Sequence, residues 1–202
     1  MKKQLIVLSA PSGAGKTTVA RHLLKSFPRL SFSVSATTRA MRPGEQHGKD
    51  YFFLTREDFL ERITDDDLIE YEQIFDNYYG TLKSVVTEAL ARGEFLIFDV
   101  DVKGALSLRH AFPDDTLLIF VAPPDMKILE QRLRNRHTES DHQIELRLAR
   151  AAMEMGHSHQ FDHVLVNDDL QATLQAAERI VRENIEGAPE QGSLFNGPSK
   201  ER

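Results

Sequence analysis

The sequence predicts an α/β fold in which helices cover both faces of a central parallel sheet. Four short apolar runs have the length of buried strands, and they span residues 5–8, 95–98, 117–121 and 164–166. A helical pattern through Val19, Ala20, Leu23 and Leu24 follows the first run, and further helices are expected at about 103–110, 125–135 and 170–185. Strands that alternate with helices form parallel sheets with right-handed crossovers, so we expect a three-layer domain.

The bulk properties are those of a globular protein that does not bind nucleic acid or membranes. A chain of 202 residues is long enough for one compact domain with an inserted subdomain. The formal net charge of -6 gives no general attraction to nucleic acid or to an anionic membrane. No apolar run approaches the roughly 20 residues that cross a bilayer. The chain also has no cysteine, which fits a reducing compartment, and we expect a cytoplasmic location.

A phosphate-binding loop is expected between the first strand and the first helix. Its candidate ATP-binding residues are Ala10, Pro11, Ser12, Gly13, Ala14, Gly15, Lys16, Thr17 and Thr18. The glycines let backbone N–H groups surround a phosphate, and the N-terminus of the helix favours an anion. Lys16 supplies a charge for the β- and γ-phosphates, and the Thr17 hydroxyl is the expected ligand of Mg²⁺. The order of strand, loop and helix therefore predicts a P-loop NTPase fold, although Ala10 replaces the first glycine of the usual motif.

The segment from about residue 32 to 79 breaks the alternation of strands and helices. It is rich in Thr, Tyr, Phe and Gly, which favours short strands and loops. We therefore expect an inserted mixed α+β lobe at about 33–93, with the core formed by 1–32 and 94–186. Arg39 and Arg42 lie close together here, and two guanidinium groups can hold a monophosphate through bidentate hydrogen bonds. Tyr51 and Tyr79 can add phenolic donors to the same phosphate.

Several motifs in series resemble the guanylate kinase family. They are Ser-Ala-Thr-Thr-Arg-Ala-Met-Arg-Pro-Gly-Glu at 35–45, Gly-Lys-Asp-Tyr-Phe-Phe at 48–53, Glu70, Asn-Tyr-Tyr-Gly-Thr at 77–81 and Asp-Val-Asp-Val-Lys-Gly at 99–104. The similarity extends over about residues 4–183. It implies that the guanine of GMP is contacted by Ser35, Glu70, Thr81 and Asp101. It also implies that the GMP phosphate is held by Arg39, Arg42, Tyr51 and Tyr79.

Carboxylates at these positions suit a guanine site. Guanine presents hydrogen-bond donors at N1 and N2, and an ionised Glu70 is purely an acceptor. Adenine presents an acceptor at N1, so the same carboxylate would face a lone pair and discriminate against adenine. Asp99 and Asp101 follow the run at 95–98, at the carboxyl end of a strand, where we expect both on one face. Asp99 is also a candidate to help hold magnesium through water.

A helical lid is expected at about 132–150. Arg132 and Arg136 are four residues apart and share a helix face, as do Arg147 and Arg150 at a spacing of three. Taken alone, this pattern is equally typical of solvated amphipathic helices. The resemblance implies that Arg132 binds ATP and that the lid brings positive charge onto the transferred phosphoryl group. The catalytic residues that it implies are Lys16, Arg39, Arg136 and Arg147.

Four features of the C-terminal half add detail to this prediction. Asn167 ends the last predicted strand, and the resemblance places it on the adenine side of ATP. His137 stands where family members often have glycine, which affects the local turn rather than the chemistry. The spacing of His157, His159 and His163 can suit a transition metal, although phosphoryl transfer needs none there. Residues 187–202 contain few apolar side chains, and we expect this tail to be disordered.

The resemblance implies a kinase that transfers the γ-phosphoryl group of ATP to GMP, and to dGMP, with Mg²⁺, for purine nucleotide recycling. Three alternatives remain open, namely a kinase of another phosphorylated acceptor such as a ribose bisphosphate, a guanylate-kinase-like protein-binding module, and a nucleic-acid-stimulated ATPase. Glu70 favours a guanine acceptor over a sugar phosphate, and the net charge of -6 disfavours the ATPase. The sequence leaves open whether the protein is a monomer or a homo-oligomer.

Overall fold

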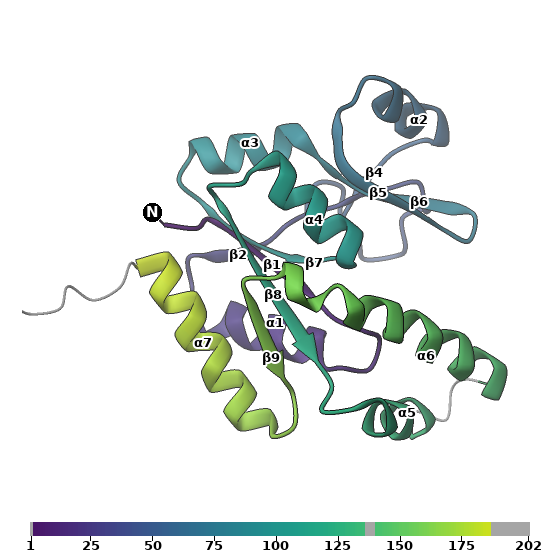
Figure 1. Cartoon of the computed structure of the whole chain (residues 1–202). Helices are drawn as coiled ribbons and strands as arrows, with labels where there is room; N and C mark the ends of the chain where they lie inside the picture. Colours follow the sequence, from purple (N-terminus) through teal and green to yellow (C-terminus); the bar gives the residue numbers. More distant parts are fainter. Residues whose placement is uncertain (1, 136–139, 187–202) are drawn as a thin grey trace, which may run out of the picture.

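The central layer of the protein is a five-stranded sheet whose strands are all parallel, which confirms the predicted α/β class. The computed structural model describes residues 2–135 and 140–186 (Figure 1). The strand order is β2-β7-β1-β8-β9. The strands are β1 (Leu5–Ser9), β2 (Leu30–Phe32), β7 (Phe95–Asp99), β8 (Thr116–Ala122) and β9 (His163–Val166). Arg136, His137 and the tail from 187 lie outside the described residues.

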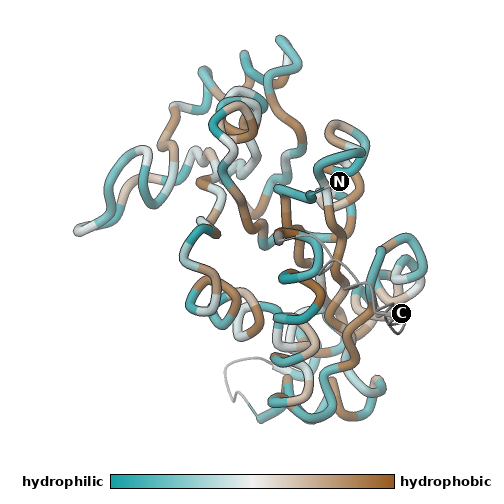
Figure 2. Tube along the Cα trace, turned by 90° about the vertical axis from the view of Figure 1, so that its left-hand side faces the viewer, coloured by the Kyte–Doolittle hydropathy of each residue, from teal (hydrophilic) through white to brown (hydrophobic). Residues whose placement is uncertain are grey.

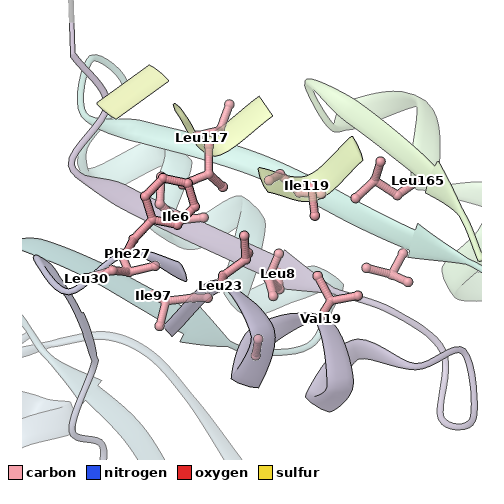
Figure 3. Close-up of a cluster of buried hydrophobic side chains, with 14 of the residues drawn as sticks. Ile6, Leu8, Val19, Leu23, Phe27, Leu30, Ile97, Leu117, Ile119 and Leu165 are labelled. Carbon is pink, nitrogen blue, oxygen red and sulfur yellow. The ribbon is translucent and has the colours of Figure 1, made fainter. Parts of the chain in front are cut away.

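Helices cover both faces of this sheet because successive residues of each buried strand point to opposite sides. Ile6 and Leu8 pack on one side against α1 (Lys16–Ser26) and α7 (Leu170–Glu186) (Figure 3). Leu5 and Val7 pack on the other side against α3 (Lys83–Ala91) and α4 (Val102–Ala111). Figure 2 shows the resulting hydrophobic colour along the central strands and the hydrophilic colour at the periphery. In the described part of the chain, no helix is long and apolar enough to cross a membrane.

Two details of the central sheet differ from the sequence prediction. β2 was not predicted as a strand, because it has three residues and only Leu30 among them is buried. Asp99 is the last residue of β7, whereas Asp101 lies beyond the strand and begins α4. The Asp101 carboxylate accepts a hydrogen bond from the Gly104 backbone N–H at 2.8 Å, as an N-cap residue does. The expectation that both aspartates share one face of a strand was therefore wrong.

A second sheet forms a separate layer with its own hydrophobic cluster. Its strand order is β4-β3-β6-β5, from β3 (Ala36–Thr37), β4 (Phe52–Phe53), β5 (Leu68–Ile74) and β6 (Asn77–Leu82). Helix α2 (Arg56–Thr64) places Phe59 against this sheet, where the Phe59 ring stacks on Tyr78 at 5.4 Å between centroids. We call residues 36–82 the small lobe. Helix α3 follows it and packs Val86 and Ala89 into the main core, while Val85 contacts the small lobe.

Two further helices lie toward the same edge of the central sheet as the small lobe, on the right in Figure 1. They are α5 (Met126–Arg134) and α6 (Asp141–Gly156), and we call this pair the lid. Leu129 and Leu133 of α5 pack against Ile144 and Ala151 of α6 in a small apolar cluster. A short 3₁₀ helix, η1 (Ser158–Gln160), then leads into β9.

Replacing Phe59 with alanine tests whether the small lobe depends on its own core. Phe59 is fully buried, and Phe→Ala in a core costs about 3–5 kcal/mol of unfolding free energy. The neighbouring Leu60 on the same helix is 41% exposed, so Leu60→Ala should cost under about 1 kcal/mol. Denaturant unfolding of both variants measures the difference. Equal losses for the two variants would contradict the assigned core.

Candidate active site

The predicted phosphate loop forms the turn between β1 and α1. Gly13 and Gly15 have φ of 96° and 105°, in the left-handed region that favours glycine. Ala10 is not among the described non-glycine residues with positive φ, which explains why alanine is accepted where the usual motif has glycine. The loop closes through a hydrogen bond from the Ala14 N–H to the Pro11 carbonyl at 3.0 Å.

The side chain of Asn167 forms a hydrogen bond with the backbone of this loop. Its Nδ2 donates to the Ala14 carbonyl at 2.7 Å, and the Asn167 side chain is buried. A Cβ atom on Gly15 would lie 2.3 Å from the same Nδ2 atom, so only glycine leaves room for this contact. The Asn167 carbonyl in turn accepts a hydrogen bond from Arg132 of α5 at 2.9 Å. Asn167 therefore links the loop through its side chain and the lid through its backbone carbonyl, at the end of β9.

Lys16 lies at the carboxyl edge of the central sheet. Its Nζ is 2.6 Å from the Asp99 carboxylate and donates to the Val100 carbonyl at 2.9 Å. Thr17 and Thr18 follow in the first turn of α1 with exposed side chains. An ammonium group, a hydroxyl group and a carboxylate thus stand together beside the loop, and this set can hold both phosphate oxygens and a hard cation.

A cavity of about 680 Å³ extends from the loop to the lid and the small lobe. Residues 10–13 and 15–18 of the loop line one wall. The other walls come from Leu146, Arg147, Arg150 and Glu154 of α6, from Ile74 and Phe75 at the tip of the β5–β6 hairpin, and from Asp101. Arg147 donates to the Ser12 hydroxyl at 2.7 Å, so the lid already contacts the loop. Arg132 Nη1 is buried and has no hydrogen-bond partner among the described residues.

The loop of the small lobe that carries Arg39 and Arg42 contains an acidic residue, Glu45, that holds it in place. We call residues 39–45 the arginine loop. Glu45 accepts two hydrogen bonds from the Arg39 guanidinium, at 2.8 and 3.0 Å, and a third from the Arg42 backbone N–H at 2.7 Å. This pairing raises the pKa of Arg39 and lowers the pKa of Glu45. The Arg39 guanidinium lies 5.3 Å from the centre of the Tyr51 ring, and Tyr51 lies 6.2 Å from Tyr79. The four residues predicted to bind the GMP phosphate therefore lie in one part of the small lobe.

Glu70 and Thr81 lie opposite each other in the β5–β6 pair. The Thr81 hydroxyl donates to Glu70 Oε1 at 2.6 Å. Burial raises the pKa of Glu70, and the nearby negative charges of Asp101 and Glu72 act in the same direction. Ser35 is half-buried just before β3, and its carbonyl accepts from the Phe52 N–H at 2.9 Å.

Sequence reasoning missed three residues that shape the site. Glu45 is part of the motif at 35–45, and its spacing of three from Arg42 is that of a local turn contact. Glu154 lines the cavity wall, and burial raises its pKa. The helical spacing places Arg150 on the same face as Arg147 but predicts no role for it, and in the structure Arg150 donates to Asp101 at 3.3 Å. The local spacing of Glu45 could have indicated its contact, whereas the contact of Arg150 with Asp101 joins segments 49 residues apart, which no local pattern reveals.

The spacing of His157, His159 and His163 makes them candidate metal ligands. His157 Nδ1 lies 2.9 Å from the Gln160 side-chain nitrogen at the end of α6. Within residues 2–135 and 140–186, no group of three or more His, Asp or Glu side chains is arranged to hold a metal ion.

The cavity beside the P-loop reaches the small lobe only at the tip of the β5–β6 hairpin, and neither Arg39 nor Arg42 lines it. A P-loop together with a separate lobe that carries its own arginine loop defines a P-loop kinase that acts on a small phosphorylated acceptor. The chain belongs to the guanylate kinase family, whose model matches residues 2–184. The resemblance seen in the sequence is thereby confirmed.

Individual relatives agree with this assignment. A guanylate kinase of Chlorobium luteolum is 49% identical over 173 residues, which cover 86% of this chain and 88% of that protein. A guanylate kinase of Gloeobacter violaceus is 47% identical over 189 residues, which cover 94% and 92% of the two chains. Among solved structures, guanylate kinase from Anaplasma phagocytophilum superposes with a TM-score of 0.67 at 32% identity, and the match covers 91% of this chain and 87% of that one.

Alanine at Gly15 should destabilise the protein more than alanine at a comparable glycine elsewhere. Both Gly15 and Gly93 have positive φ, which costs a residue with a Cβ about 1–2 kcal/mol. Gly93 has open space around it, whereas Gly15→Ala must also displace Asn167 from Ala14. We expect losses of roughly 2–5 kcal/mol for Gly15→Ala, against about 1–2 kcal/mol for Gly93→Ala, in denaturant unfolding. Similar losses would show that Asn167 does not constrain the loop.

Glu70→Gln should make the protein more stable at neutral pH. Because the pKa of Glu70 is raised in the folded state, stability falls as the pH rises from the ordinary carboxyl pKa of 4.5 through the raised value. Glutamine removes that loss, so the gain appears above this pH window and disappears at lower pH. Glu94→Gln is the opposite control, because Arg92 lowers the pKa of Glu94. Thermal melts across pH measure both signs, and a destabilised Glu70→Gln protein at neutral pH would contradict the account.

Proposed function

We propose that this chain transfers the γ-phosphoryl group of ATP to GMP and releases ADP and GDP. The observation that carries the proposal is the pairing of two anion sites, a P-loop with Lys16 and a separate arginine loop with Arg39, in a chain with the guanylate kinase fold. One site suits the polyphosphate of ATP, and the other suits a monophosphate. A kinase needs both, because the reaction joins two nucleotides.

We propose that one group of residues binds the guanine base of GMP and a second group binds its phosphate. Glu70 accepts from guanine N1–H and N2–H, with Thr81, Asp101 and Ser35 as neighbouring polar contacts. Thr81 already bonds one oxygen of Glu70, and this contact orients the carboxylate before the base arrives. The GMP phosphate is assigned to Arg39, Arg42, Tyr51 and Tyr79. Glu45 holds the Arg39 guanidinium in place, so little side-chain entropy is lost when the phosphate binds.

The donor site is proposed to be the P-loop, residues 10–18, closed by the lid. Lys16 moves from Asp99 to the β- and γ-phosphates, a short transfer for a flexible ammonium side chain. Arg147 lies beside Ser12 of the loop, where it can neutralise charge on the transferred group. Arg132 and Asn167 support the adenosine side, and Arg136 remains a predicted catalytic residue outside the described segments.

Magnesium fits the oxygen donors of this site. The Thr17 hydroxyl is exposed toward the cavity at the start of α1, and the Asp99 carboxylate lies beside Lys16 at the end of β7. Hydroxyl and carboxylate oxygens are the ligands that Mg²⁺ prefers, often with water between metal and carboxylate. We propose that Thr17 holds the ion directly and that Asp99 holds it through water. When bound, the ion would neutralise charge on the β- and γ-phosphates.

The reaction needs no covalent enzyme intermediate. An oxygen of the GMP phosphate, already ionised at neutral pH, attacks the γ-phosphorus of ATP while the bond to the β-phosphate oxygen breaks. Positioning by Arg39 and Arg42 and electrostatic stabilisation by Lys16 and Arg147 carry most of the rate. Closure of the lid excludes water, so ATP hydrolysis without GMP should be much slower than transfer.

The same proposal extends to the cellular role. The guanine contacts leave the ribose 2′ position unassigned, so we propose that dGMP is also an acceptor. A cytoplasmic role in purine nucleotide recycling fits the substrates and a chain without cysteine. The competing functions are a kinase for another acceptor and a protein-binding module without activity, and one assay separates them.

The decisive measurement is ADP release with GMP, dGMP, AMP, CMP and UMP as acceptors. We expect turnover with GMP and dGMP and little with the other three. Lys16→Met should lower kcat by about 100-fold or more, because it removes a charge that acts on the transferred phosphoryl group. Lys25→Met, at the exposed end of the same helix, is the matched control and should keep full activity. Turnover of AMP without GMP would favour another acceptor, and full activity of Lys16→Met would overturn the P-loop assignment.

A further inference from the structure

One arginine of the lid contacts three separate parts of the structure. Arg150 lies on α6, and its Nε donates to Glu154 of the same helix at 2.9 Å. Its Nη2 donates to Asp101 at the start of α4 at 3.3 Å and to Glu72 on β5 of the small lobe at 3.5 Å. A single guanidinium therefore joins the lid, the core and the small lobe.

These partners belong to a group of carboxylates beside the cavity. Asp101 and Glu72 are close enough to Glu70 to raise its pKa, and Asp101 also acts on Glu154. Like charges at such separations repel one another, and GMP brings further negative charge. Arg150 directly contacts three of the four carboxylates, so it offsets repulsion that would otherwise push β5 away from α4 and α6.

Helix α6 and strand β5 also present apolar side chains to the cavity. Leu146 precedes Arg150 by four residues and shares its helix face, and Ile74 follows Glu72 by two residues on the same side of β5. Ile74, Leu146 and the hairpin-tip residue Phe75 line the cavity and are 43%, 59% and 91% exposed. Phe75 also has a left-handed φ of 53°, a conformation that costs a bulky residue energy. An apolar surface thus lies next to the Arg150 contacts and can be buried as lid and lobe approach.

Resting on the proposed function, we propose that Arg150 is a positioning residue that couples the lid to the small lobe. Through Asp101 it acts on the guanine contacts, and through α6 it acts on Arg147 and the ATP phosphates. Binding of either nucleotide then favours the lid and lobe positions that the other requires. Arg150 touches neither substrate in this scheme and acts only by holding the two binding sites in register.

Binding measurements on Arg150→Gln test this coupling directly. Calorimetry gives the Kd of GMP with and without a non-hydrolysable ATP analogue, and the ratio of the two is the coupling between the sites. We expect Arg150→Gln to reduce this ratio about two- to five-fold and to raise the KM for GMP by a similar factor, as for partly exposed ion pairs. The value of kcat should change less, because no group that touches the transferred phosphoryl is removed.

A double-mutant cycle separates coupling from general damage. Glu72→Gln should have a smaller effect in the same direction, and Arg150→Gln with Glu72→Gln should be no worse than Arg150→Gln alone. Arg150→Lys should restore part of the coupling, since it keeps the charge but not the three-way contact. Arg134→Gln is the matched control, because Arg134 pairs with Glu130 and Asp141 of the lid and does not line the cavity.

The possible outcomes are distinguishable. A wild-type protein that does not phosphorylate GMP would refute the proposed function itself. A wild-type protein that does so, with unchanged coupling in Arg150→Gln and Arg150→Lys, would overturn the role of Arg150 alone. Strictly additive effects of the Arg150 and Glu72 substitutions would also overturn it. If Arg150→Gln melts below the assay temperature, Arg150→Lys and Glu72→Gln decide the question by the same measurements.

Discussion

The site depends on one constraint, that all five parallel strands of the central sheet end at the same edge. The P-loop follows β1, Asp99 ends β7, and Asn167 follows β9. These segments are far apart in the chain, yet Lys16 lies 2.6 Å from Asp99 and Asn167 lies 2.7 Å from Ala14. The three central strands, β1, β7 and β8, are almost wholly buried, and they anchor the loop whose glycines have left-handed φ.

A second theme is that three cationic side chains of the site pair with carboxylates of the protein itself. Lys16 pairs with Asp99, Arg39 with Glu45, and Arg150 with Asp101 and Glu154. Such pairs orient the long side chains, so part of the entropy of ordering them is lost on folding rather than on binding. They also moderate the repulsion among the carboxylates around Glu70, whose pKa is raised by burial. The protein thereby keeps an acidic pocket for guanine next to basic sites for phosphate.

Local sequence patterns predicted much of this architecture. Apolar runs identified four of the five core strands, because a buried parallel strand needs nearly continuous hydrophobic residues. The glycines and Lys16 identified the loop, since its backbone geometry demands those residues. The pattern failed at Leu30, in a strand of three residues that pairs only at the edge of the sheet. It also failed at Asp101, which caps a helix instead of extending a strand.

The sequence alone determined the fold class, the phosphate loop and the candidate residues for both nucleotides, because these depend on local backbone chemistry and on motifs that stand in one stretch of chain. Only the tertiary structure decided which charges meet. Whether Arg150 reaches Glu72, or Asn167 reaches Ala14, depends on how the lid, the small lobe and the strand ends pack together. Contacts of this kind follow from the summed packing of distant segments, and no single segment encodes them.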